Sequence, residues 1–203
     1  MKNQSNKNII AQFYKQVIGK RDTSLIYSLV REDYIQHSQG KDGREGLLEM
    51  MEFLKTLPPS TETQSPVKML LADGDLVAGL LDIKFMGKRM LVVDLFRIED
   101  GMLAEHWDAV QEISGDVVIE PFIIDESATT TAFNKDLIAE KIGSNFKRVI
   151  AEGDIVVAQS ALIVDGSLYA SYDIFRIANG SVVTQLNVRQ LVPDVMMHNN
   201  GMI

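Results

Sequence analysis

The N-terminal part of the chain carries hydrophobic residues at helical spacing in three separate stretches. The first stretch ends at Gly19, the second is short, and the third begins after Asp42 and ends at Pro58, because proline cannot continue a helix. The residues that define the three faces are Ile9, Ile10, Phe13, Tyr14 and Val17, then Leu25, Ile26, Leu29 and Val30, and then Leu47, Leu48, Met51 and Leu54. The pattern predicts three helices before the first strand.

Beyond these helices, hydrophobic runs alternate with short turns that contain glycine. Gly74, Gly87 and Gly101 each follow or precede a polar residue between two hydrophobic segments, which is typical of a β-hairpin. The pattern predicts an antiparallel meander with strands at Leu76–Phe85, Lys88–Ile98 and Met102–Glu112.

The meander is repeated further along the chain without gaps. Residues 72–111 align with residues 151–190 at a constant offset of 79, and 11 of the 40 aligned positions are identical, including the glycines at all three turns. Only one helix, at about Ala132–Phe146, is expected before the second meander. We therefore expect a complete unit at 1–115, a connector at 116–131 that could add a strand, and a shortened second unit at 132–203.

Composition excludes several classes of protein. The 203 residues are 46% hydrophobic and 24% charged, which is typical of a globular chain, and the net charge of −8 offers no basic surface for nucleic acid or an anionic membrane. No hydrophobic run approaches the roughly 20 residues of a membrane span. The polar N-terminus carries no signal-peptide pattern, so a cytoplasmic location is expected. With no cysteine and three scattered histidines, neither disulfides nor a metal site is expected.

Several short motifs occur along the chain in a definite order and spacing. They are Asp33–His37, Gly43–Gly46, Val93–Gly101, Ala104–Asp108 and the closing His198–Ile203. In this order and spacing they resemble the SnoaL-like family of small polyketide cyclases, within the nuclear transport factor 2-like superfamily. The resemblance covers nearly all of 5–113 and resumes at about 133–203.

The resemblance implies an α+β fold in which N-terminal helices and a strongly curved antiparallel sheet form a cone. Members of the family close a ring by an intramolecular aldol reaction without metal or cofactor, and an acidic residue in the cone is the base. That base falls at Asp108 here, while a pocket histidine of the family falls at Asp94. Proteins of this fold commonly pair through their open sheet faces, which implies a homodimer or an intramolecular pseudo-dimer.

The residues themselves also single out Asp94. It interrupts an otherwise hydrophobic strand face, where burial would raise the pKa of its carboxyl. A two-residue hairpin loop sets Asp94 opposite Trp107 and turns Asp108 away. A three-residue loop sets Asp94 opposite His106, with the two carboxylates about 7–8 Å apart on one face. A bulge further along the strand would change either register, and the sequence leaves these alternatives open.

Other residues are candidates for binding or for polarising a carbonyl. His37 and Tyr14 are the expected donors to an enolate oxygen, and Tyr34, Phe96, His106 and Trp107 are the expected pocket residues. Each of these has an ordinary structural role as its alternative, and so does Asp94, because the repeat keeps its counterpart Asp173. Asp108 becomes Asn187 in the repeat, so any catalysis is expected in the first unit.

Three functions remain open at this point. The first is cofactor-free acid–base catalysis on a hydrophobic carbonyl compound, as an aldol-type cyclase or an isomerase. The second is a binding module that uses the same cone without catalysis. The third is a structural pseudo-dimer, in which the first unit covers the sheet face that the shortened second unit leaves bare.

Overall fold

The computed structural model describes residues 2–59, 64–125, 128–143 and 146–203. The first sheet is preceded and interrupted by helices. In chain order these elements are α1 (Lys2–Gln12), the π-helix η1 (Phe13–Gly19), the 3-10 helix η2 (Thr23–Leu25), α2 (Ile26–Leu29), β1 (Val30–Gln36) and α3 (Gly43–Thr56). The three predicted helical regions are therefore confirmed.

Two sheets follow. The five-stranded sheet has the order β1-β5-β4-β3-β2 and contains β2 (Val67–Asp73), β3 (Leu76–Phe85), β4 (Lys88–Glu99) and β5 (Met102–Glu112). The four-stranded sheet has the order β6-β7-β8-β9 and contains, after α4 (Ala128–Ile142), the strands β6 (Phe146–Glu152), β7 (Ile155–Val164), β8 (Ser167–Ala178) and β9 (Ser181–Leu191). The predicted hairpins are confirmed in both sheets.

Three local expectations from the sequence were wrong. The segment expected to be a helix followed by a turn before His37 is the strand β1, which runs parallel to β5. Phe146 begins β6 instead of ending a helix, and neither β6 nor β2 was predicted. No strand forms in the described part of the connector, residues 116–125, while 126–127 lie outside the described residues. In the first two cases pairing with another strand overrides the local pattern.

The two sheets match strand for strand. Each strand from β6 to β9 begins and ends 79 residues after its counterpart among β2 to β5. The irregularities match as well, since the register shifts between Arg97 and Ile98 in the first sheet and between Arg176 and Ile177 in the second. The repeat therefore extends from the sequence to the backbone.

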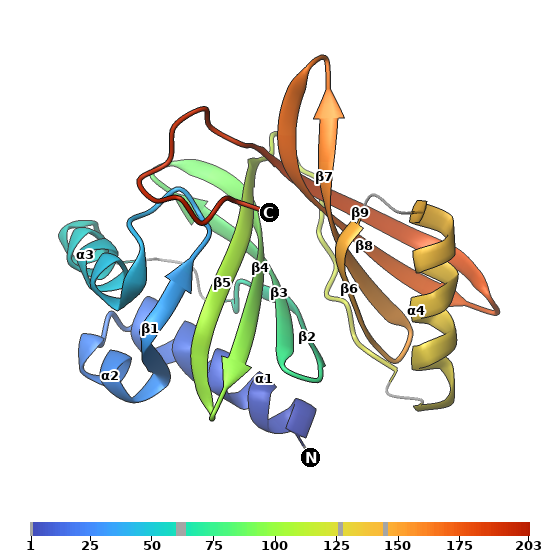
Figure 1. The fold of residues 1–203 in the computed structure, drawn as a ribbon, viewed down its shortest axis with the longest axis horizontal. Helices are drawn as coiled ribbons and strands as arrows, with labels where there is room; N and C mark the ends of the chain where they lie inside the picture. Colours follow the sequence, from blue (N-terminus) through green and yellow to red (C-terminus); the bar gives the residue numbers. More distant parts are fainter. Residues whose placement is uncertain (1, 60–63, 126–127, 144–145) are drawn as a thin grey trace.

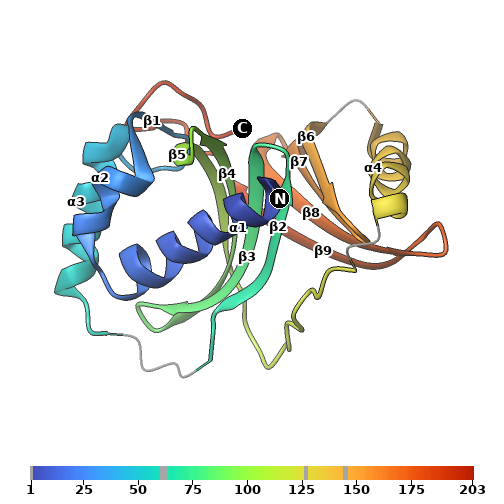
Figure 2. The same ribbon diagram turned by 90° about the horizontal axis from the view of Figure 1, so that it is seen from below.

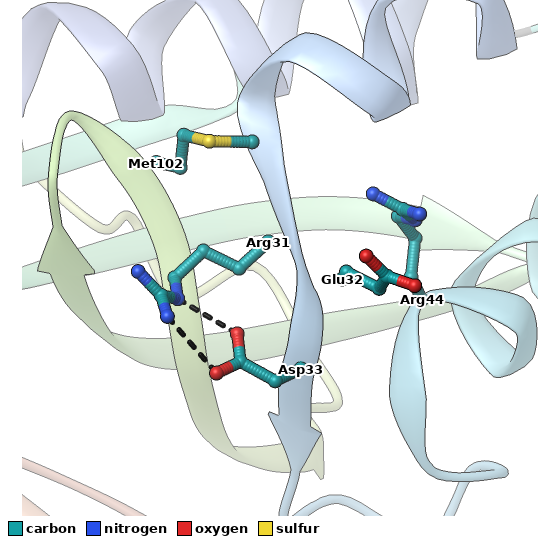
Figure 3. Close-up of a pocket in the computed structure, with 5 residues that line it drawn as sticks. All are labelled: Arg31, Glu32, Asp33, Arg44 and Met102. Carbon is teal, nitrogen blue, oxygen red and sulfur yellow. Dashed lines mark hydrogen bonds and ion pairs between the residues drawn. The ribbon is translucent and has the colours of Figure 1, made fainter.

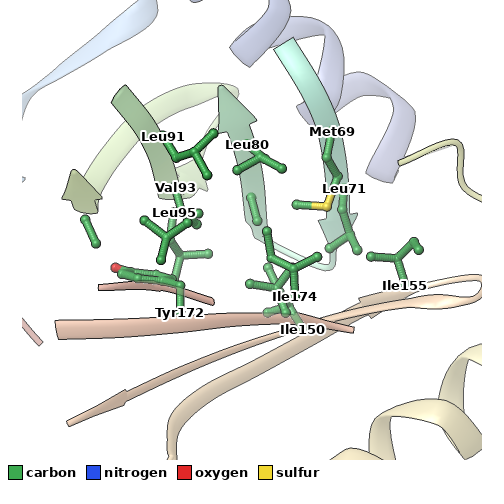
Figure 4. Packing of buried hydrophobic residues seen from close by; sticks show 14 of the residues in the cluster. Met69, Leu71, Leu80, Leu91, Val93, Leu95, Ile150, Ile155, Tyr172 and Ile174 are labelled. Carbon is green, nitrogen blue, oxygen red and sulfur yellow. The ribbon is translucent and has the colours of Figure 1, made fainter. Parts of the chain in front are cut away.

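The molecule is layered. The N-terminal helices lie over the concave face of the first sheet, the second sheet lies against its convex face, and α4 covers the far face of the second sheet (Figures 1 and 2). Leu91, Val93 and Leu95 of the first sheet pack in one core cluster with Tyr172 and Ile174 of the second (Figure 4). A separate cluster fills the space between the helices and the concave face of the first sheet.

Among the described residues, no helix has the length and hydrophobicity needed to cross a membrane.

Candidate active site

The register of the β4–β5 hairpin brings the two candidate carboxylates together. The loop is the two-residue turn Asp100-Gly101, where both residues have positive φ (52° and 77°), as a type I′ turn requires. A bulge then adds one residue to β5 before Glu105, so that Asp94 pairs directly with Asp108. The structure thus combines the short loop with the downstream bulge, and the two carboxylates share the concave face.

Asp94 is the centre of a hydrogen-bond network. It is buried, with 7% of its surface exposed. Tyr14 donates its hydroxyl to Asp94 Oδ2 at 2.6 Å, and His106 Nε2 lies 3.0 Å from Asp94 Oδ1. On its other side, His106 Nδ1 lies 2.9 Å from Gln36 Oε1. One chain of contacts therefore links η1, β4, β5 and β1.

The backbone around Gln36 fixes the protonation of His106. Gln36 Oε1 accepts hydrogen bonds from the backbone N–H groups of His37 and Ser38, at 3.1 and 3.3 Å, so it is an acceptor and His106 Nδ1 carries the proton. Burial alone would lower the pKa of His106, but the hydrogen bond to Asp94 and the charges of Asp94 and Asp108 outweigh it and raise this pKa. Both ring nitrogens of His106 are therefore engaged, Nδ1 by Gln36 and Nε2 by Asp94.

Gln36 was missed by the sequence analysis. The motif residues Tyr34 and His37 were named as candidates, but Gln36 was not. In a strand, alternate side chains point to opposite faces of the sheet, so Tyr34 and Gln36 lie on one face and His37 lies on the other. The alternation would have been a usable signal had the segment been recognised as a strand.

Tyr14 reaches Asp94 because of two local features. It lies in η1, whose wider turn is closed by a hydrogen bond from Lys20 N to Lys15 O at 3.2 Å. Opposite it on β3, Gly79 pairs with Asp94, and a Cβ at this position would lie 2.4 Å from the Tyr14 hydroxyl. A side chain at Gly79 would push the phenol away from the carboxylate.

Asp108 differs from Asp94 in having little support for its charge. Its Oδ1 is buried and has no hydrogen-bond partner among the described residues. Burial raises the pKa of Asp108 to about 6, with Asp94 adding to the rise and His106 opposing it. A carboxylate of this kind is mostly ionised at neutral pH and remains basic enough to accept a proton.

Tyr34 offers a donor that nothing else uses. Its ring is buried in the cone cluster, and its hydroxyl makes no hydrogen bond within the described part of the chain. Burial raises the pKa of Tyr34 well above its ordinary value, and the charge of Asp108 is the next largest cause. A neutral phenol close to a carboxylate is thus available to a ligand.

Hydrophobic side chains extend from Asp108 along β4 and β5 toward the β3–β4 hairpin turn. Val110 and Val92 pair across β5 and β4, and Met90 and Ile83 pair across β4 and β3, all on the same face as Asp108. Val110, Met90 and Ile83 are partly exposed, as is Asp108 itself. Phe96 closes the other side, where its ring stacks on His106 at 4.5 Å between centroids.

His37 and Trp107 lie outside the cone, contrary to expectation. Both belong to the opposite face of the sheet, where their rings stack at 4.6 Å between centroids. His37 Nδ1 donates to the Gly201 carbonyl and its Nε2 lies 2.8 Å from Glu105 Oε1, so both nitrogens are engaged. Trp107 is 1% exposed in the core between the sheets, with the Arg148 guanidinium 3.9 Å from its ring centroid. Strand alternation separates both residues from Asp108.

Asp94, His106 and Asp108 are also a group whose ligand atoms could approach a metal ion, since these atoms lie within 4.8 Å of one another. The donor chemistry does not fit. A histidine binds a metal ion through a deprotonated ring nitrogen. In His106, Nδ1 donates to Gln36 and Nε2 faces Asp94. The three residues fit a proton-transfer site better than a metal site.

A separate open depression lies on the outer side of β1 (Figure 3). Arg31, Glu32, Asp33, Arg44 and Met102 line it. Arg31 holds Asp33 through two hydrogen bonds of 2.7 and 2.9 Å, so its guanidinium is already paired. The depression shares no lining residue with the Asp94–Asp108 site.

A curved sheet with helices over a concave face that holds the two carboxylates gives the protein an α+β architecture. The chain belongs to the SnoaL-like polyketide cyclase family, whose sequence profile matches residues 8–114. The match contains all the site residues from Tyr14 to Asp108 and ends before the second sheet.

Solved structures include several that are similar to this chain. IdmH, a candidate polyketide cyclase from Streptomyces antibioticus, is 23% identical, with 52% of this chain and 91% of that chain covered and a TM-score of 0.43. A candidate ketosteroid isomerase from Kribbella flavida is 18% identical, with 62% and 91% covered and a TM-score of 0.46. An NTF-2 like protein of unknown function from Burkholderia xenovorans is 13% identical, with 64% and 94% covered and a TM-score of 0.45. No curated protein matches the sequence.

Proposed function

We propose that this protein performs cofactor-free acid–base chemistry on a hydrophobic carbonyl compound, as an aldol-type cyclase or an isomerase, with Asp108 as the base. The observation that carries the proposal is the buried, unpartnered oxygen of Asp108 beside Asp94, together with a pKa of about 6. Membership of the SnoaL-like family supports the substrate class, since the family's name is that of a polyketide cyclase.

Each group has a distinct role in the proposed reaction. Asp108 removes a proton from the carbon next to the carbonyl, the C–H electron pair forms the enolate, and Tyr34 donates to the enolate oxygen. In a cyclase the enolate carbon attacks a second carbonyl, and the proton held by Asp108 passes to the new alkoxide. In an isomerase the same proton returns to another carbon. His106 and Asp94 stay as an ion pair throughout.

The pair of His106 and Asp94 helps to keep the base ionised at neutral pH. Asp94 Oδ1 faces His106 and Asp94 Oδ2 accepts the Tyr14 hydroxyl, so both of its oxygens are already engaged. The positive charge of His106 limits the rise in the pKa of Asp108, which burial and Asp94 would otherwise carry further. The base is therefore ionised at neutral pH without a bound metal.

Exchange of α-protons tests the proposal without knowledge of the natural substrate. The protein would be incubated in D2O with hydrophobic 1,3-diketones and 3-ketosteroids, and loss of the α-proton signal would be followed by NMR. We expect faster exchange than in buffer, with an Asp108→Asn variant slower by about 10²–10⁴-fold. Asp173→Asn, in the second sheet, is the matched control and should exchange at the wild-type rate. Equal rates for wild type and Asp108→Asn would contradict the proposal.

The binding module remains the alternative from another class. It is favoured by the closed network around Asp94, in which Tyr14, His106 and Gln36 are all committed to one another. A pure binder would show saturable chemical-shift changes at Asp108 or Tyr34 with the same ketones, but no exchange above the rate in buffer.

We further infer that the second half is a shortened copy of the first and that the two form an intramolecular pseudo-dimer. Matching strand bounds, the shared core and the matching bulges support this. Because each convex face is already covered by the other, we expect a monomer by light scattering. A dimer would contradict the pseudo-dimer if cross-linking placed its interface on the convex faces.

A further inference from the structure

The last residues of the chain leave the second sheet and contact the first half. Val192 N still donates to Leu168 O at 2.9 Å, and beyond it the chain runs back toward β1, in red in Figure 1. There His198 Nε2 lies 2.7 Å from Ser38 O, and Met202 is buried, with 2% of its surface exposed. The segment after β9 therefore ends on the half of the molecule that holds the site.

Two contacts of this segment fall on the end of β1. Asn200 Nδ2 donates to the carbonyl oxygen of Gln36 at 2.9 Å, and the Gly201 carbonyl accepts from His37 Nδ1 at 2.8 Å. Asp42 Oδ1 accepts the Gln36 N–H at 2.8 Å. Asn200 and Asp42 thus hold the Gln36 backbone from both its carbonyl and its amide side.

The end of β1 needs this support. β1 is an edge strand of its sheet, among the described strands it pairs with β5 alone, and its register is irregular between Val30 and Ile35. Gln36 is the residue whose side chain accepts the Nδ1 proton of His106. A shift of the Gln36 backbone would leave that proton without its acceptor, in a site where His106 is 9% exposed.

We propose that Asn200 is a positioning residue for the acid–base site, acting through Gln36 on His106. The second half of the chain thereby contributes to the site of the first half through the segment that follows β9. The proposal rests on the proposed function for its catalytic meaning, but the effect on His106 is independent of catalysis.

The test follows the three histidines by nitrogen-detected NMR as a function of pH. Asn200→Ala removes the bond to Gln36, and Asn200→Leu keeps about the size of the side chain while removing its donor without adding a charge. Asn199→Ala is the matched control, because Asn199 is an exposed neighbour of the same type for which no hydrogen bond is found in the described part of the chain. A His106→Gln variant assigns the His106 signals.

We expect the titration of His106 to move to lower pH by roughly half a unit in both Asn200 variants, the effect of one weakened hydrogen bond. Asn199→Ala should leave it in place. In the ketone assay, Asn200→Ala should lower kcat by about tenfold with a smaller change in KM. An unchanged His106 titration in both Asn200 variants overturns the proposal, even if their thermal stability falls. A shifted titration in a protein that exchanges no ketone leaves the positioning role intact and removes the proposed function.

Discussion

The concave faces of the two sheets share one backbone and differ in chemistry. Asp94 and Asp173 occupy equivalent positions, but Asp173 is bonded by two neutral amides, from Gln185 at 2.9 Å and from Asn187 at 3.1 Å. The first face carries a histidine and a second carboxylate at those positions. Amides satisfy a carboxylate without titrating, so the second face is a polar patch with no acid–base couple.

Burial separates the two faces as strongly as residue type does. Asp94 is buried below the N-terminal helices, whereas Asp173 is partly exposed and Gln185 is exposed. The helix α4 packs in one cluster with Ala151, Val156, Ala158, Phe175 and Ile177, while Asp173 and Gln185 stay accessible to solvent. The raised pKa of Asp108 therefore depends both on the neighbouring carboxylate and on the helices that exclude water from the first face.

Among the further variants, Tyr34→Phe is expected to have the largest effect on activity, and the described residues of the second half include no strand equivalent to β1. Replacement by phenylalanine removes the proposed donor to the enolate and should slow ketone exchange by about 10²–10³-fold. Thermal stability should change little, since the hydroxyl makes no hydrogen bond among the described residues. Tyr172→Phe, which loses a 2.8 Å bond to Gln159 in the second half, should keep the wild-type rate. An unaffected rate in Tyr34→Phe would assign the donor role elsewhere.

The convex faces of the two sheets share one core cluster, so equivalent substitutions there should lower stability by similar amounts. Leu95 and Ile174 are equivalent positions, 1% and 0% exposed, in one core cluster. Alanine at either position should lower the free energy of unfolding by about 2–5 kcal/mol. Because the cluster is shared, calorimetry of each variant should show a single transition. Two separate transitions in Ile174→Ala would mean that the halves unfold independently.

The raised pKa of Asp108 lowers the stability of the folded protein. The second sheet has Asn187 at the equivalent position, so it carries no such cost. Its carboxyl binds a proton more tightly in the folded state, with a pKa of about 6 against an ordinary value of 3.8, so stability falls as pH rises between these two values. At pH 7 the cost is fully present, and Asp108→Asn should raise the free energy of unfolding by roughly 2–3 kcal/mol. Urea unfolding of both proteins from pH 4 to pH 7 measures the difference. A constant difference across that range would contradict the raised pKa.

The smallest expected effect comes from exchanging Gly79 with its counterpart Ala158. Gly79→Ala should displace Tyr14 from Asp94 and lower stability by about 1–3 kcal/mol, with slower exchange. Ala158→Gly should cost at most about 1 kcal/mol and leave exchange unchanged. In a Tyr14→Phe background, where no hydroxyl meets the new Cβ, the loss of activity caused by Gly79→Ala should shrink. An equal loss in both backgrounds would show that Gly79 acts by another route.

Much of the fold follows from local patterns. The helices ending near Gly19 and Pro58 and the hairpins at Gly87 and Gly101 were predicted because spacing and turn residues act over a few positions. The paired roles of Asp94 and Asp108 were also visible as candidates. Their register was not, because it depends on a bulge in β5 that no turn residue marks.

The rest of the site depends on contacts between distant segments. β1 is a strand only because it pairs with β5, and that pairing decides that Gln36 faces His106 while His37 faces Trp107. The close approach of the Tyr14 hydroxyl to Gly79 likewise depends on two segments that are far apart in the chain.

By itself the sequence determined the helices, the meanders, their repetition at an offset of 79 and the family, because these reside in short-range periodicity and motifs. The tertiary structure alone decided which side chains share a face, which carboxylate is left without a partner and where the last segment of the chain lies. Those features follow from strand pairing and burial, which depend on residues that are distant in sequence.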